Sequence, residues 1–96
     1  MDKNYELELY KLVMDKEDNF VDELGWISDT EFCVWISYYQ LNDFINRATE
    51  IFGYGMFDDG GFKANMQSHC ACIDLCEMFG DYVDIESVFS KDIYQH

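Results

Sequence analysis

The sequence predicts an α+β fold, in which a small antiparallel sheet of two to three strands packs against one long helix and a C-terminal helical region. Three observations predict it: one segment that alternates at period two, one rich in β-branched and aromatic residues, and one with helical periodicity. At 96 residues the chain is short enough to form a single domain over residues 1–96. Its composition, 49% hydrophobic and 18% aromatic, predicts a packed core rather than disorder.

Residues 4–14 are predicted to form the first strand, because apolar and polar residues alternate there. The residues expected on its buried face are Tyr5, Leu7 and Leu9. Residues 15–31 then form an acidic connection that is expected to hold to the core through its apolar residues. Those residues are Phe20, Val21, Leu24, Trp26 and Ile27.

Residues 31–36 are predicted to form a central strand, since they are aromatic and β-branched. A helix over residues 38–52 follows, with Ser37 and Gln40 at the spacing of a capping box and Gly53 at the C-terminal cap position. Its apolar residues recur at helical spacing. They are Leu41, Phe44, Ile45, Ala48 and Phe52.

The second half of the chain is less regular. Residues 58–61, Asp-Asp-Gly-Gly, predict a turn before a strand at 61–68. Residues 70–83 fit either a strand or a helix, and the helix is favoured because apolar and acidic residues then fall on opposite sides. Asp84 is expected to cap a short last helical turn, and the chain after Ser90 is expected to fray.

The net charge excludes several classes of function. Twenty Asp and Glu oppose six Lys and Arg, which gives −14. Direct binding of nucleic acid or of an anionic membrane needs a basic surface, which this chain lacks. No apolar run approaches the roughly 20 residues of a membrane span, and the first residues lack the apolar core of a secretion signal. The sequence therefore predicts a cytoplasmic protein.

The acidic residues are concentrated in two segments, residues 15–31 and residues 74–86, which contain a single basic residue, Lys16. Unbalanced like charge at helical spacing costs stability, so its placement suggests a binding role. On a helix, Asp74, Glu77 and Asp81 would form a row with a charge spacing of about 4–6 Å, comparable to the phosphates of one DNA strand. The residues predicted to bind a partner are Asp74, Glu77, Asp81, Asp84, Glu86, Asp15, Glu17, Asp18, Asp22 and Glu23.

The four cysteines, Cys33, Cys70, Cys72 and Cys76, are expected as free thiols that fill space in the core. They lack the paired C-x-x-C spacing of structural zinc sites, although a zinc-stabilised interaction module remains an alternative. His69 and Cys70 are adjacent, so their side chains diverge and His69 is badly placed to activate the thiol. We therefore predict no enzyme activity, no metal and no cofactor.

The stretch from Phe57 to Phe89, FDDGGFKANMQSHCACIDLCEMFGDYVDIESVF, resembles small proteins of mobile elements in gut Firmicutes. In size and charge the whole chain is also similar to the small acidic inhibitors of phages and mobile elements, including anti-CRISPR and antirestriction proteins that mimic DNA. The resemblance implies a phage or mobile-element protein that acts in the cytoplasm of a bacterial host cell. It implies no role for any individual residue.

Charge placement and resemblance together give one functional hypothesis: a non-enzymatic inhibitor that binds the basic nucleic-acid-binding surface of a host defence nuclease by acidic DNA mimicry. Its expected partner is a basic protein, and a homodimer is compatible with the sequence. Two alternatives are an immunity protein that neutralises a cognate nuclease toxin and the zinc-stabilised module.

Overall fold

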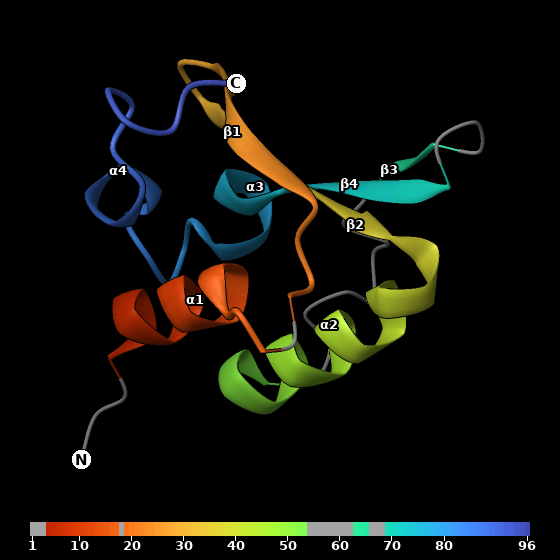
Figure 1. Ribbon diagram of the computed structural model, residues 1–96. Helices are drawn as coiled ribbons and strands as arrows, with labels where there is room; N and C mark the ends of the chain where they lie inside the picture. The colour runs from red at the N-terminus through yellow and green to blue at the C-terminus, as the bar shows by residue number, and fades with distance from the viewer. Residues whose placement is uncertain (1–3, 18, 54–62, 66–68) are drawn as a thin grey trace.

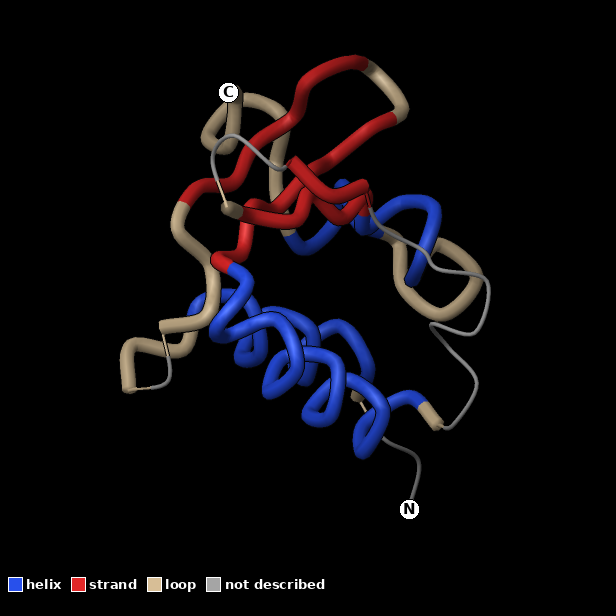
Figure 2. The backbone as a smooth tube through the Cα atoms, turned by 90° about the vertical axis from the view of Figure 1, so that its right-hand side faces the viewer, coloured by secondary structure: helices blue, strands red, loops and turns tan. Residues whose placement is uncertain are grey.

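The computed structural model describes residues 4–17, 19–53, 63–65 and 69–96 (Figure 1). The elements are α1 (Tyr5–Met14), β1 (Glu23–Ser28), β2 (Glu31–Ser37), α2 (Tyr38–Phe52), β3 (Lys63–Asn65), β4 (Cys70–Asp74), α3 (Leu75–Phe79) and α4 (Ile85–Val88). The strands form one antiparallel sheet in the order β1-β2-β4-β3. Figure 2 shows α1 and α2 packed on one side of this sheet. The predicted α+β fold class is confirmed.

The first element is a helix, so the strand predicted for residues 4–14 is wrong. Asn4 caps α1, and its side-chain Oδ1 accepts a hydrogen bond from the backbone N–H of Leu7 at 3.1 Å. Leu7, which was expected on a buried strand face, is 46% exposed. The buried residues have helical spacing and are Leu9, Leu12 and Val13. Packing of this stripe against α2 and α4 outweighs the local alternation of the first residues.

The acidic connection contains a strand of its own. β1 pairs with β2, with Leu24 opposite Val34 and Trp26 opposite Phe32. Residues opposite one another share a face, so both pairs point to the core side of the sheet. β2 confirms the predicted strand at 31–36. The expected anchoring of the connection is confirmed for Phe20 and Trp26, which are buried, whereas Ile27 is 48% exposed.

α2 confirms the predicted helix at 38–52. Gly53 ends it with φ 111°, a conformation that favours glycine, and its N–H donates to the carbonyl of Thr49 at 2.8 Å. Ser37 lies at the N-cap, but its hydroxyl donates to Gln40 Oε1 at 3.2 Å instead of capping a backbone N–H. The expected reciprocal capping box is therefore replaced by a contact between the two side chains.

The segment 70–83 is neither one helix nor one strand. Its first part, β4, pairs with β2, which places Ile73 opposite Val34 in the core. The chain then enters α3 at Asp74, whose Oδ1 accepts a hydrogen bond from the backbone N–H of Cys76 at 3.0 Å. α3 ends at Phe79. The expected helical row of Asp74, Glu77 and Asp81 is therefore wrong.

Two further predictions concern segments near the described residues. Of the strand predicted at 61–68, residues 63–65 form β3 and pair with β4. The turn predicted at residues 58–61 lies outside the described residues. Asp84 is the N-cap of α4, as expected, and its Oδ2 accepts a hydrogen bond from the Ser87 hydroxyl at 2.7 Å.

Residues 90–96 are ordered against the sheet, so the expected fraying is wrong. The N–H of Trp26 donates to the carbonyl of Tyr94 at 2.7 Å, and the N–H of His96 donates to the carbonyl of Trp26 at 3.3 Å. This short parallel bridge covers the free edge of β1. His96 packs so closely over Gly25 that a Cβ there would lie 2.7 Å from the Cβ of His96.

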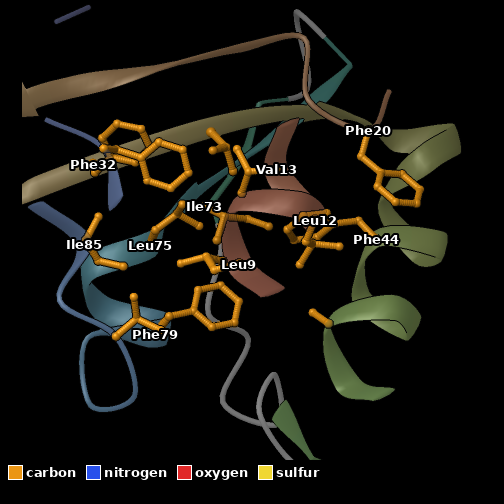
Figure 3. Close-up of a cluster of buried hydrophobic side chains, with 14 of the residues drawn as sticks. Leu9, Leu12, Val13, Phe20, Phe32, Phe44, Ile73, Leu75, Phe79 and Ile85 are labelled. Atoms are coloured by element: carbon orange, nitrogen blue, oxygen red, sulfur yellow. The ribbon is translucent and has the colours of Figure 1, made fainter. Parts of the chain in front are cut away.

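The core lies between the sheet and the helices (Figure 3). One buried cluster contains Leu9 and Leu12 of α1, Phe44 of α2, Ile73 of β4 and Phe79 of α3. α3 packs against β2, and α4 packs against α1. Within the described residues, no helix is long and apolar enough to cross a membrane.

Candidate protein-binding groove

An acidic groove of about 480 Å³ lies between the turn that joins β1 to β2 and the connection from α3 to α4. Four of its side chains are carboxylates: Asp29, Asp81, Asp84 and Glu86. None of the described residues that line it is a lysine or an arginine. The other residues that line it are Trp26, Thr30, Cys76, Gly80, Tyr82, Val83 and Ile85. The groove therefore places concentrated negative charge beside aromatic side chains.

The connection between α3 and α4 is fixed by its own backbone. The N–H groups of Tyr82 and Val83 both donate to the carbonyl of Phe79 at 2.9 Å, which closes a tight turn after α3. Val83 and Ile85 point into the core. The carboxylates beside these two anchors, by contrast, are exposed on the groove side. Because buried and exposed residues alternate after α3, the acidic side chains lie on the groove side of this connection.

The carboxylates of the groove differ in their partners. Asp84 accepts the Ser87 hydroxyl, and Glu86 Oε2 lies 3.8 Å from the Nζ of Lys91. Within the described part of the chain, the side chains of Asp29 and Asp81 have no hydrogen-bond or ion-pair partner. Two of the four charges are thus available to a cationic ligand without first breaking a contact.

The pKa values of two side chains near the start of α3, Asp74 and Cys76, are raised. Burial raises the pKa of Asp74, and the nearby charge of Glu31 adds to this effect. Burial also raises the pKa of the Cys76 thiol, with further contributions from the charges of Asp74 and Asp84. Cys76 is therefore a neutral thiol at pH 7 and contributes polarisable surface rather than charge.

The structure gathers part of the predicted acidic site. Asp81, Asp84 and Glu86 lie together in the groove. Asp74 sits instead at the junction of β4 and α3, and Glu77 is exposed on α3 outside the groove. The second acidic segment is thus divided between two places because the chain changes direction after Phe79.

The first acidic segment does not join the groove at the positions predicted. Asp15 lines a separate pocket of about 200 Å³ between α1 and α2, where Lys11 and Arg47 also lie. Glu17 and Asp22 are exposed, and Asp18 lies outside the described residues. Glu23 Oε2 is 3.3 Å from His96 Nε2.

Sequence reasoning missed one acidic residue of the groove and its aromatic wall. Asp29 reaches the groove because the hairpin of β1 and β2 brings its turn beside the α3–α4 connection. Trp26 was expected only as a core anchor, and Tyr82, which is 47% exposed, only as one of the apolar residues of the favoured helix at 70–83. Asp29 precedes a predicted strand, and this position indicates a turn. It does not indicate which residues lie near Asp29 in the folded protein.

The four cysteines lie on β2, β4 and α3. All four are free, and among the described residues no group of three or more His, Cys, Asp and Glu side chains is arranged to hold a metal ion. The register places Cys33, Cys70 and Cys72 on the face of the sheet opposite the helical core. Burial, together with a hydrogen bond to Cys72, raises the pKa of Cys33 to about 12.

Compared with protein-family models, with curated proteins and with solved structures, the chain matches none of them.

Proposed function

We propose that this protein is a non-enzymatic inhibitor that binds the basic nucleic-acid-binding surface of a host defence nuclease, such as a CRISPR effector or a restriction enzyme. The observation that carries the proposal is the groove, in which four carboxylates converge without a basic lining residue among those described. Such a surface attracts a strongly basic protein at a rate that depends on salt.

The lining of the groove favours specific binding of a protein over nonspecific attraction of cations. Its apolar wall includes Trp26 and the partly exposed ring of Tyr82, and aromatic residues are enriched at the centres of protein interfaces. Its volume of about 480 Å³ falls in the range of roughly 300–1,000 Å³ found for binding pockets and can accept side chains. Basic side chains of a partner could thus gain both ion pairs and packing.

The mode of mimicry differs from the one expected from sequence. The expected helical row of Asp74, Glu77 and Asp81 does not form, because α3 ends at Phe79. In the proposal, a compact group of charges engages the side chains that otherwise hold phosphates, and the partner's nucleic acid is excluded by competition. The inhibitor need not follow the path of a DNA strand.

The proposal is tested by capturing the target. The tagged protein is used to retain proteins from cells that express candidate defence systems, and a retained nuclease is then tested for loss of DNA binding. The test variant is Asp81→Asn/Asp84→Asn/Glu86→Gln, and the matched control is Asp15→Asn/Glu17→Gln/Asp22→Asn, which removes the same formal charge elsewhere. Capture by the wild type and the control but not by the groove variant supports the proposal. Equal capture by all three, or a retained nuclease that still binds DNA, overturns it.

A further inference from the structure

A cation of the chain itself lies at the edge of the acidic groove. The Nζ of Lys91 is 5.0 Å from the centroid of the Trp26 ring and 3.8 Å from Glu86 Oε2. A cation over an indole face and beside a carboxylate is the arrangement by which proteins hold guanidinium and ammonium groups. Trp26 and Glu86 both line the groove, whereas Lys91 lines the adjoining hollow.

The aromatic part of this arrangement is fixed in place. The Trp26 indole N–H donates to the carbonyl of Phe89 at 2.8 Å, and its ring packs edge-on against Phe32 at a centroid distance of 5.3 Å. Trp26 as a whole residue is 9% exposed, so most of the side chain is enclosed by the protein. A ring that is already oriented loses little freedom when a cation binds to it.

Lys91, by contrast, is held weakly. One third of its side chain is exposed, at 34%, and its ion pair with Glu86 is long and lies at the surface. Exposed pairs of this kind contribute little to stability and exchange readily with other cations. The adjoining hollow shares Trp26 and Asp29 with the groove, so withdrawal of Lys91 would uncover the indole between the two.

From this geometry we infer that Trp26 and Glu86 form a subsite for an arginine side chain of the partner, and that Lys91 occupies this subsite until the partner displaces it. The inference rests on the proposed function and specifies how the groove recognises its partner. Arginine fits better than lysine because its planar guanidinium can stack on the indole and still pair with a carboxylate through two N–H groups.

The test uses nona-arginine as a probe, with binding measured at about 50 mM salt, where surface ion pairs are weakly screened. Lys91→Met keeps the aliphatic stem and removes the competing charge. Lys16→Met, at an exposed position outside the groove, is the matched control for the change in net charge. We expect Lys91→Met to bind the peptide about 3–10-fold more tightly than wild type, and Lys16→Met to change affinity by less than about 2-fold.

A second readout locates the peptide. The two tryptophans give two indole N–H resonances, which Trp35→Phe assigns. We expect the Trp26 resonance to shift on addition of nona-arginine while the Trp35 resonance stays in place. Equal affinities for the two lysine variants, or binding that leaves the Trp26 resonance unmoved, would overturn the subsite.

The two proposals can fail separately. A nuclease that is captured through the groove acids although Lys91→Met has no effect leaves the proposed function standing and removes the subsite. If nona-arginine displaces Lys91 as expected but no defence nuclease is captured, the subsite stands as a property of the groove and the proposed function is wrong.

Discussion

The ring of Phe32 on β2 stacks on the ring of Phe89, which directly follows α4, with centroids 4.7 Å apart and planes 17° from parallel. Both side chains are fully buried. Tyr94 meets both rings edge-on, and Trp26 meets Phe32 in the same way. This aromatic cluster ties the hairpin to the C-terminal segment and so fixes the two sides of the acidic groove relative to each other.

Phe89→Ala should therefore destabilise the whole fold. Deleting a fully buried aromatic side chain typically costs about 3–5 kcal/mol, through lost burial and the cavity that remains. Urea unfolding followed by circular dichroism measures the loss. Tyr39→Ala is the control, because Tyr39 is 82% exposed and its loss should change stability by no more than about 0.5 kcal/mol. A Phe89→Ala protein as stable as this control would contradict the assigned core.

Asp74→Asn should show a gain in stability that depends on pH. Because burial raises the pKa of Asp74, the folded state binds its proton more tightly than the unfolded chain does, and stability falls as pH rises through that pKa. Asparagine keeps an oxygen that can accept the Cys76 N–H but carries no charge. We expect wild type and variant to be alike below about pH 4, and the variant to be more stable by at most about 1 kcal/mol at pH 7.

Thermal unfolding at pH 3.5 and pH 7 checks this prediction, with Glu77→Gln on the exposed side of α3 as the control for the loss of one charge. An Asp74→Asn variant that loses stability relative to wild type as pH rises would show that the sign is wrong.

The thiols should differ in reactivity. Burial and the neighbouring Cys72 raise the pKa of Cys33 to about 12, so very little thiolate forms at pH 8. We expect iodoacetamide to label Cys33 at least about 100-fold more slowly in the folded protein than in urea, as followed by mass spectrometry of peptides. Cys70, which is only half-buried, is the internal comparison. Folded-state labelling of Cys33 as fast as that of Cys70 would contradict the structure.

Sequence patterns predicted the elements whose formation depends on local information. The helix at 38–52 has a long apolar stripe and a terminal glycine, and β2 is a run of strand-forming residues, so both were predictable. The helix within the segment 4–14 was not predictable, because the apolar residues at its start fit both the period of a strand and the period of a helix. Only the contacts of Leu12 and Val13 with the rest of the core decide in favour of the helix. Residues 70–74 form β4 because they pair with β2, and α3 begins only after Asp74. This pairing is a long-range contact, so no local pattern in the sequence encodes it.

The part of the candidate site that depends on local sequence was predictable, and the part that depends on long-range packing was not. Asp81, Asp84 and Glu86 lie close in sequence and remain close in space. The contribution of Asp29 depends on the hairpin, and the contact of Lys91 with Trp26 depends on the packing of residues 90–96 along β1. Both are long-range consequences of the fold, so charge counting along the chain could not reveal them.

The most direct test of the central claim is the affinity of the captured nuclease for three proteins: the wild type, the groove variant Asp81→Asn/Asp84→Asn/Glu86→Gln and the control Asp15→Asn/Glu17→Gln/Asp22→Asn. We predict that the groove variant binds about 30-fold or more weakly, that the control changes by less than about 3-fold, and that wild-type affinity falls between about 50 and 200 mM salt. Equal losses in the two variants, or a wild-type affinity that salt leaves unchanged, would contradict binding through the acidic groove.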